Sequence, residues 1–189
     1  MCAKRPEWMT AEYARECLDY DPATGQFVWR ARPLYHFRST ERRLAEHVWA
    51  NWNAQFPGKI AGSIGSKGYI LIHVHGENFR AHRIAWLIVH GDWPPDQIDH
   101  KNGDKTDNRM ANLRPATNRQ NVCNRPVQSN SVSGCKGVRF DPRRNRWRAQ
   151  IIVAGKKRHI GNFKTLGSAA EAYADAAKLY HGEFAHHSL

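Results

Sequence analysis

Residues 97–121, QIDHKNGDKTDNRMANLRPATNRQN, place one Asp–His pair beside an unusual number of small amide side chains. Asp99 and His100 are adjacent, and the stretch that follows them is crowded with Asn, Asp and Gly. One carboxylate and one amide oxygen make a hard, incomplete set of ligands, which suits Mg²⁺ or Mn²⁺ completed by water and phosphate oxygens. The segment therefore predicts a divalent metal ion held jointly by the protein and its substrate.

Other kinds of metal site fit these residues poorly. An EF-hand is excluded, because a loop with Gly103 at its sixth position would begin at Ile98, where an Asp is required. Zinc is disfavoured, because thiolate and imidazole ligands are missing at the needed spacing. The four cysteines contain no C-x-x-C pair, which favours reduced thiols over a structural zinc site.

A strand, a loop, a second strand and a helix are predicted to position these side chains. Their ranges follow one another along the chain: strand 97–100, loop 101–112, strand 113–117 and helix 117–124. Thr117 and Gln120 have the spacing of a capping box, which marks the start of the helix. Asn121 then lies in the first turn, from which its side chain can point back toward Asp99 and His100.

The residues before this segment are predicted to mix hairpins and helices. Four patterns carry the signals: a hairpin turning at Gly25, a helix within 40–52 capped by Thr40, a hairpin turning at 76–78, and a buried helix over 83–91 that ends at a Gly. We interpret His73, His75 and His82 as packing or hydrogen-bonding residues rather than metal ligands.

Composition indicates a folded protein with a polyanionic partner. The 189 residues, 41% of them hydrophobic, suffice for one large domain or two small ones. No segment approaches the ~18 apolar residues of a membrane span, and the N-terminus lacks the apolar region of a signal peptide. We therefore expect a cytoplasmic protein with no membrane partner. The net charge of +12 favours nucleic acid as the partner.

The positive charge is concentrated in residues 134–189, which carry eleven Lys or Arg against four Asp or Glu. This segment follows a polar linker at 126–133 and is predicted to form three strands and one helix. Ser168 and Glu171 have capping-box spacing at the start of the helix, and Gly182 follows its last apolar residue.

One predicted strand of this segment has two different faces. Alternate residues share a face, so the apolar set is Trp147, Ala149 and Ile151, and the polar set is Arg146, Arg148 and Gln150. We expect one face to pack on the helix, while the other is basic and polar.

The pattern DH, followed by NGDKTDNRMANLR and then NRQN, resembles the HNH endonucleases of the phage and homing type. That family has a ββα-metal fold with the same order of strand, loop, strand and helix, and the resemblance covers residues 58–124. Asp99, His100, Asn112 and Asn121 match the motif in identity and spacing. Many members have His at the last metal position, and Asn121 is the variant of the homing subgroup.

The resemblance implies a role for each matching residue. His100 would take a proton from water as the water attacks phosphorus. Asn112 would brace the loop and orient His100. Asp99 and the Asn121 carbonyl would hold Mg²⁺ or Mn²⁺ against the scissile phosphate. The expected products carry 5′-phosphate and 3′-hydroxyl ends.

The basic C-terminal segment resembles an AP2 DNA-binding domain. The matching pieces are KGVR, WRAQI, HIGNFKT, AAEAYADAA and HGEFA, and they cover nearly all of residues 134–189. In that family the three-stranded sheet enters the major groove. The resemblance therefore implies DNA contacts at six positions: Lys136, Arg139, Arg146, Arg148, Gln150 and His159. His159 replaces the second Trp of the plant domains, which leaves the base preference open.

These observations predict an α+β protein, a ββα-metal nuclease core joined to a three-stranded antiparallel sheet and helix. Its expected parts are an N-terminal α/β extension (1–57), an HNH nuclease domain (58–125), a linker (126–133) and an AP2-like domain (134–189). We expect a monomer or weak dimer that nicks double-stranded DNA or cuts it with site preference, needs no organic cofactor, and acts in the host cytoplasm if phage-encoded.

The rival interpretation is a non-catalytic DNA-binding regulator in which the HNH part is a relic. The intact Asp99, His100 and Asn121 argue against such decay. An RNA target is a second alternative, disfavoured because the major groove of A-form RNA is too narrow for the predicted sheet.

Overall fold

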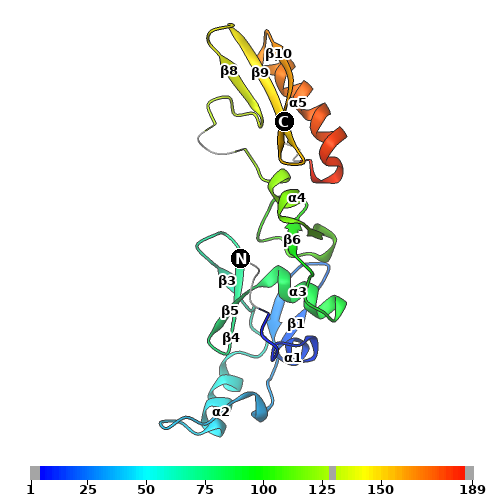
Figure 1. Ribbon diagram of the computed structural model, residues 1–189. Helices are drawn as coiled ribbons and strands as arrows, with labels where there is room; N and C mark the ends of the chain where they lie inside the picture. The colour runs from blue at the N-terminus through cyan, green and yellow to red at the C-terminus, as the bar shows by residue number, and fades with distance from the viewer. Residues whose placement is uncertain (1–4, 128–130, 186–189) are drawn as a thin grey trace. The chain divides into compact units, whose positions relative to one another are not determined.

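The computed structural model describes residues 5–127 and 131–185 as a mixed α and β protein of short helices and several small sheets (Figure 1). This content confirms the α+β class. The chain divides into two compact units, Met1–Pro115 and Ala116–Leu189. The domain limits expected at residues 57 and 125 stay predictions. Among the described residues, no helix combines the length and apolar character needed to cross a membrane.

The first unit begins with a helix and a hairpin. Helix α1, Ala11–Cys17, starts after Thr10, whose hydroxyl accepts a hydrogen bond from the backbone N–H of Tyr13 at 3.2 Å. Strands β1, Leu18–Tyr20, and β2, Phe27–Trp29, pair antiparallel. The turn between them contains Gly25 at φ 74°, which confirms the hairpin predicted there.

A helix lies in the region predicted for it, but with a different start. The 3₁₀ turn η1, Leu34–His36, precedes helix α2, Ala45–Gln55. The predicted cap at Thr40 is wrong, because Thr40 pairs with Arg43 in a tight bridge before the helix begins. Ser39 supplies the side-chain oxygen instead, and it accepts from the backbone N–H of Ala45 at 3.0 Å.

Three strands and a helix follow. Strands β3, Ser63–Ile64, β4, Ile70–Val74, and β5, Glu77–Arg80, form one sheet in that order. The hairpin between β4 and β5 turns at His75 and Gly76, both at positive φ, so the prediction of a turn at 76–78 is about one residue late. Helix α3, Ala81–His90, ends at Gly91 with φ 86°, as predicted for the buried apolar segment.

The segment predicted to carry the chemistry has the predicted order of elements. Strands β6, Gln97–His100, and β7, Leu113–Ala116, form a two-stranded sheet, with the 3₁₀ turn η2, Met110–Asn112, in the loop between them. Helix α4, Asn118–Cys123, follows, and both hydrogen bonds of the Thr117–Gln120 capping box are present. This helix belongs to the second unit.

One hydrophobic core joins most elements of the first unit. Its buried members come from α1 and the first hairpin, from β4 and α3, and from the β6–β7 pair. Ala14 and Cys17 are fully buried in it together with Ile72 and Ile84, and Leu113 is 5% exposed. The N-terminal residues therefore pack into the same core as the strand that carries Asp99 and His100.

The second unit contains a three-stranded antiparallel sheet backed by a long helix. Its elements are β8, Val138–Asp141, β9, Arg146–Val153, β10, Lys156–Phe163, α5, Leu166–His181, and the 3₁₀ turn η3, Gly182–Phe184. The strand order is β10-β9-β8. Ala149 and Ile151 of β9 are buried with Ala169 and Ala177 of α5, which confirms the face predicted to pack on the helix.

The start of α5 differs from the prediction. The cap is Thr165, whose hydroxyl accepts from the backbone N–H of Ser168 at 3.2 Å, so the box predicted at Ser168 and Glu171 is wrong. The helix begins three residues earlier because Thr165 has the extended backbone of a cap and Ser168 is already helical. Gly182 ends the helix, as predicted.

Candidate active site

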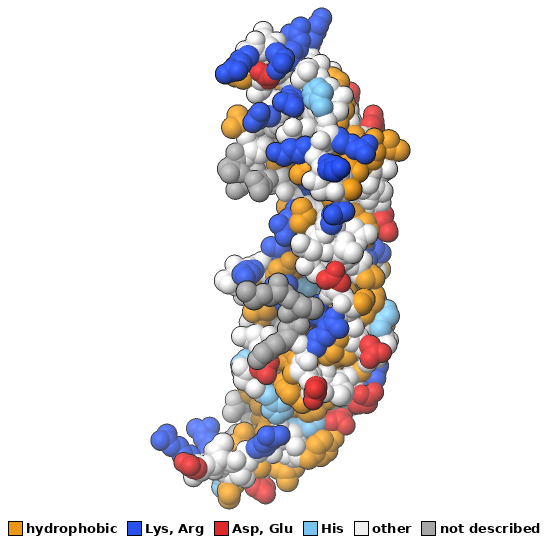
Figure 2. Space-filling view, in the orientation of Figure 1, with side chains coloured by type: hydrophobic (Ala, Val, Ile, Leu, Met, Phe, Trp, Pro, Cys, Tyr) orange, Lys and Arg blue, Asp and Glu red, His pale blue; other side chains and the backbone are white. Residues whose placement is uncertain are grey.

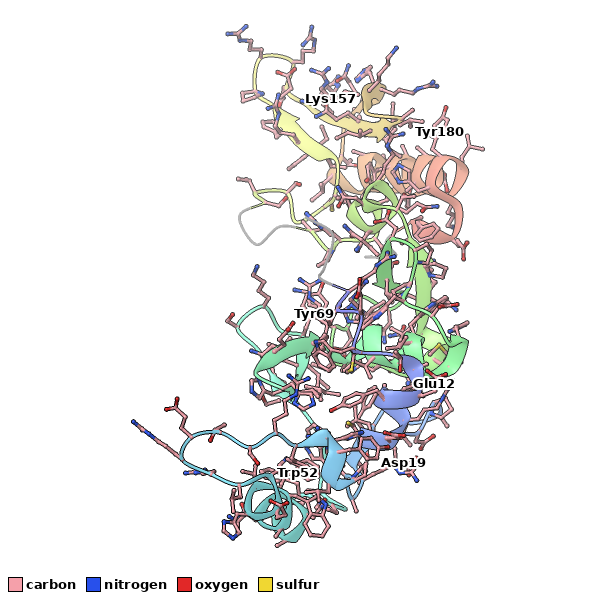
Figure 3. All side chains as sticks on the ribbon, turned by 60° about the horizontal axis from the view of Figure 1, so that its bottom comes forward. Glu12, Asp19, Trp52, Tyr69, Lys157 and Tyr180 are labelled. Carbon is pink, nitrogen blue, oxygen red and sulfur yellow. The ribbon has the colours of Figure 1, made fainter. Side chains whose placement is uncertain are left out.

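His100 lies at the end of β6 in a buried position, 4% exposed. Its ring contacts His82 edge-on at a centroid distance of 4.9 Å and Tyr69 at 6.0 Å. Its Nε2 lies 3.4 Å from the Oδ1 of Asn108, a residue that is itself 1% exposed. Tyr69, labelled in Figure 3, also lies under the side chains of Arg80 and Lys105. Polar and aromatic contacts together thus hold the ring.

Burial lowers the pKa of His100 below its ordinary value of 6.5. The hydrogen bond that the ring donates to Asn108 Oδ1 and the charge of Asp99 act in the opposite direction and offset only part of this effect. The pKa of the neighbouring His82 is lowered well below its ordinary value, chiefly by burial. Both imidazoles are therefore neutral near pH 7, and a neutral imidazole can accept a proton.

Asp99 is buried and paired with Arg114 of the facing strand. The Nε and Nη2 of Arg114 both donate to Oδ2 of Asp99, at 2.9 and 2.7 Å. Both side chains are more than nine-tenths buried. The ion pair holds the carboxylate in one orientation. The structure thus makes Arg114 the partner of Asp99.

Asn112 braces the loop between β6 and β7, and its role in orienting His100 stays a prediction. Its Oδ1 accepts from the backbone N–H of Asn102 at 3.0 Å, and its Nδ2 donates to the backbone oxygen of Asp107 at 2.8 Å. Its backbone oxygen accepts from the N–H of Lys101 at 2.9 Å. The amide side chain that contacts the ring nitrogen of His100 is that of Asn108.

The rest of the loop is held by a carboxylate. Asp107 accepts from Asn102 at 2.8 Å and from two nitrogens of Arg109 at 2.6 and 2.8 Å. The guanidinium of Arg109 holds the pKa of Asp107 down to about 2. The small polar residues of the loop therefore hydrogen-bond mainly to one another.

The first hairpin also supports the site. The hydroxyl of Tyr20 donates to the backbone oxygen of Asn108 at 2.7 Å, and the backbone N–H of Met110 donates to the oxygen of Pro22 at 3.0 Å. A Cβ at Gly25 would meet the backbone nitrogen of Arg109 at 2.5 Å. The turn of this hairpin therefore lies directly on the loop that holds His100.

Asn121 lies in the first turns of α4, in the second unit, and is half-buried. Its backbone N–H donates to the oxygen of Thr117 at 3.0 Å, within the helix. The capping box holds the helix start, so the position predicted for Asn121 on the helix is the observed one. The structure thus brings Asp99, His100 and Asn112 together within the first unit. It places Asn121 on helix α4 of the second unit.

The candidate metal ligands are two oxygen donors. Within the described part of the chain, no three His, Cys, Asp or Glu side chains form a group that could hold a metal ion. Asp99 supplies a carboxylate that is hydrogen-bonded by Arg114, as ligating carboxylates usually are, and Asn121 supplies an amide oxygen. Two oxygen ligands fit Mg²⁺ or Mn²⁺, which keep several waters and substrate oxygens.

Five of the six residues predicted to contact DNA lie on the three-stranded sheet. Arg139 of β8 is the direct cross-strand partner of Arg148 in β9, and Gln150 is the partner of His159 in β10. Arg146 pairs opposite Asp141 at the end of β8. Figure 2 shows blue Lys and Arg side chains gathered over this sheet, and Lys157, labelled in Figure 3, lies at its edge.

The sixth, Lys136, lies before β8, and its ammonium group contacts backbone oxygens of α4 and the residues just after it.

Two supporting residues carry no sequence signal that ties them to the site. Asn108 is of a residue type that is common in turns, and Tyr20 lies in a strand that is far away along the chain. Asn108 lies eight positions from His100 in an irregular loop, so no periodicity connects them. Tyr20 and Asn108 are 88 positions apart, and only the folded core brings them together.

Comparisons with known proteins find one family model and two similar proteins. A family model described as HNH endonuclease matches residues 79–123. The chain is 35% identical over 124 residues to a protein of Acanthamoeba polyphaga mimivirus named an uncharacterized HNH endonuclease, an alignment that covers 65% of this chain and 63% of that protein. It is 30% identical over 107 residues to Protein 3.8 of Escherichia phage T7, covering 56% of this chain and 88% of that protein. No solved structure matches.

Proposed function

The chain belongs to the HNH endonuclease family, a family of nucleases, and on this premise we propose that it is a divalent-metal-dependent endonuclease of double-stranded DNA. The observation that carries the proposal is the buried His100 beside Asp99, with its pKa lowered and its ring held by Asn108. A base of this kind is neutral at working pH and fixed in one orientation.

The proposed reaction is phosphodiester hydrolysis. His100 accepts a proton from a water molecule, the water oxygen forms a bond to phosphorus, and the bond between phosphorus and the 3′ oxygen breaks. The 3′ oxygen takes a proton from solvent, which leaves 5′-phosphate and 3′-hydroxyl ends. Asp99 and Asn121 would hold Mg²⁺ or Mn²⁺, which when bound stabilises the charge developing on the phosphate and the leaving oxygen.

The supporting residues act on His100 and Asp99. Asn108 orients the imidazole, and Arg114 holds the Asp99 carboxylate in one direction. Asn112 holds the loop at the backbone of Asn102. Through these contacts the residues keep the base in place without themselves meeting the reacting atoms.

We assign target selection to residues 134–189, which we propose to be an AP2-like DNA-binding domain. The support is a three-stranded sheet whose inner face packs on α5 and whose outer face carries Arg139, Arg148, Gln150 and His159. A sheet of this kind can enter the major groove, where side chains read base edges. Strong positive charge supplies affinity for phosphate, and it is not specific by itself.

A single active site cuts one strand, so nicking by a monomer or weak dimer is the proposed mode. The similarity to a phage T7 protein supports action in the cytoplasm of an infected host. The alignment spans less than two thirds of the mimivirus relative. We therefore do not infer the activity of that whole protein for this chain.

One experiment separates this proposal from a DNA-binding regulator with a relic nuclease domain. Supercoiled plasmid is incubated with the full chain and Mg²⁺, and open-circular and linear products are followed over time. We expect open circles first, no cleavage in EDTA, and a loss of at least about 10² in rate for His100→Ala with DNA affinity retained. His73→Ala is the matched control, because His73 is an exposed histidine of β4 that contacts Asn78. DNA binding without any metal-dependent cleavage supports the regulator.

A further inference from the structure

The half-buried Lys136 contacts the end of helix α4. Its ammonium donates to the backbone oxygens of Cys123 at 2.5 Å and Arg125 at 2.8 Å, and it lies 3.5 Å from the oxygen of Val122. These three carbonyls belong to the last turn of α4 and the residues just after it. An ammonium group has three donors, so the geometry uses its full capacity.

The end of α4 needs such a partner. The helix has six residues and no basic residue in its last turn. Helices this short are marginal in water without tertiary support, and the last carbonyls of a helix have no partner within it. A cation at this end also interacts favourably with the helix dipole. The Thr117–Gln120 box holds one end of α4, and Lys136 holds the other.

The backbone of Lys136 is anchored to the sheet and to α5. The next residue, Gly137, has φ 69°, and its carbonyl oxygen accepts from the N–H of Gln150 in β9 at 2.9 Å. A Cβ on Gly137 would clash with the ring of Tyr173 in α5. The hydroxyl of Ser133 donates to the backbone oxygen of Val138 at 2.7 Å. The lysine therefore extends from a fixed point of the sheet domain.

Burial and the positive charge of Arg125 lower the pKa of Lys136, an effect that Cys123 partly offsets. An ammonium group taken out of water in this way is stabilised by the carbonyl dipoles around it. A lysine that served only to attract phosphate would gain nothing from such burial.

We infer that Lys136 is a positioning residue that fixes α4, and with it Asn121, to the DNA-binding sheet. The inference rests on the proposed function, because Asn121 matters only if it binds the metal ion. The metal-binding helix then keeps a defined placement on the unit that docks on DNA. This reassigns Lys136 from the DNA-contacting set implied by the AP2 resemblance.

The test of the contact compares three variants of the full chain, and a fourth variant, Asn121→Ala, tests the metal assignment. Lys136→Met removes the donors and keeps much of the apolar stem, whereas Lys136→Arg keeps donors that can reach carbonyl oxygens. Lys157→Met is the matched control, because it removes the same charge from an exposed lysine of β10.

The first readout is amide hydrogen exchange in α4 without metal or DNA, followed at Asn121 and Asn124, whose N–H groups donate within the helix. We expect exchange about tenfold faster in Lys136→Met, since hydrogen bonds to a charged donor are among the stronger ones. Lys136→Arg should restore most of the protection, and Lys157→Met should match the wild type.

The second readout is Mn²⁺ binding measured by electron paramagnetic resonance with uncleavable DNA. Lys136→Met should raise the Mn²⁺ midpoint about tenfold, as loss of a group that orients a ligand does. Unchanged exchange and midpoint, together with weaker DNA binding like that of Lys157→Met, would make Lys136 a phosphate contact and overturn the inference. If Asn121→Ala kept the wild-type Mn²⁺ midpoint, the assignment of Asn121 as a metal ligand would be wrong. The exchange data would still test the contact between Lys136 and α4.

Discussion

The hydroxyl of Tyr20 donates to the backbone oxygen of Asn108, and the side chain of Asn108 contacts His100. Tyr20 belongs to β1, within the segment expected to be a separate N-terminal extension. The contact is buried, so it links the first hairpin to the proposed base through two consecutive polar interactions. The N-terminal residues therefore support the active-site loop directly.

Removing that hydroxyl should loosen the site. Tyr20→Phe leaves the ring in place and deprives a buried carbonyl of its donor, which costs about 1–3 kcal/mol. We expect a lower free energy of unfolding in urea and slower nicking, with little change in DNA affinity. Tyr180→Phe, on an exposed ring of α5, is the control and should alter neither quantity. Equal stability of Tyr20→Phe and wild type would argue that the loop is held elsewhere.

Gly25 should tolerate no side chain. It has φ 74°, and a Cβ would lie 2.5 Å from the nitrogen of Arg109 and 2.6 Å from the carbonyl carbon of Asn108. Backbone cannot move aside as a flexible side chain can. We expect Gly25→Ala to destabilise by well over the ~1 kcal/mol that positive φ alone costs, and to slow cleavage.

Gly58→Ala isolates the conformational part of that cost. Gly58 has a similar φ of 80°, and a Cβ at this position would have no neighbour within 4 Å. The difference between the two variants in thermal unfolding therefore measures the clash with the loop. Indistinguishable melting temperatures would contradict the close approach of the hairpin turn.

Replacing Arg114 should destabilise the protein far more than replacing the exposed Arg109. Arg114→Ala leaves the buried Asp99 without its guanidinium partner, which costs about 3–5 kcal/mol for a buried pair. Arg109→Ala breaks an ion pair of similar length whose arginine is about half exposed, and exposed pairs contribute about 1 kcal/mol or less. Chemical denaturation of both variants checks the ranking. A larger loss for Arg109→Ala would show that Asp99 is stabilised by other contacts.

His36 should make stability fall in mild acid. It is buried, and its ring contacts Tyr13 and its nitrogens contact Glu16, Arg32 and Cys17. Burial is the largest cause that lowers its pKa below 6.5; the hydrogen bond to Glu16 raises it and Arg32 lowers it. The unfolded chain therefore binds a proton at a higher pH than the folded one.

The contribution of neutral His36 is fully present above pH 6.5 and is lost as pH falls toward the lower folded pKa. Urea unfolding at about pH 7.5 and about pH 5.5 should show lower stability in acid, and His36→Gln should reduce the difference. His47→Gln, an exposed histidine of α2, controls for the loss of an imidazole. An undiminished difference in His36→Gln would assign the acid sensitivity to another group, such as His82.

Local signals in the sequence predicted the helices and strands around the site. The sequence did not predict the contacts between residues that are far apart along the chain. The strand, loop, strand and helix order and the Thr117–Gln120 box depend on neighbouring residues, so pattern and capping chemistry suffice. The start of α5 was misplaced because Thr165 and Ser168 both carry a capping hydroxyl, and only the backbone conformation distinguishes them.

The partners of the site residues were harder to predict. Arg114 and Asp99 face each other because β6 and β7 pair in one register, which the loop between them determines. Lys136 was assigned to the sheet face by resemblance, yet the turn before β8 directs it to α4. Each depends on how separate elements meet, which no single stretch of sequence encodes.

The proposed DNA face carries a charge conflict that gives the last prediction. Arg139 and Arg148 are direct partners on neighbouring strands, and like charges directly opposite each other are destabilising. Among the described residues, the buried Nε of Arg148 has no hydrogen-bond partner. The neighbouring Arg146 lies opposite Asp141, where opposite charges attract. A phosphate between Arg139 and Arg148 would relieve their repulsion. A surface that binds phosphate is therefore expected to lose some folding stability to this repulsion when no DNA is bound.

Arg148→Gln should therefore stabilise the protein by up to about 1 kcal/mol while weakening DNA binding and lowering the salt dependence of the binding constant by about one counterion. Arg146→Gln, which leaves Asp141 without its cross-strand partner, should weaken the fold by a few tenths of a kcal/mol. Thermal unfolding and fluorescence anisotropy on a DNA duplex at two salt concentrations measure both quantities. Opposite signs of the two stability changes, with the larger loss of affinity in Arg148→Gln, would identify the row of Arg139 and Arg148 as the surface that meets phosphate. If Arg148→Gln destabilised the fold and left DNA affinity unchanged, this face of the sheet would be structural, and the DNA contacts would have to come from other basic residues.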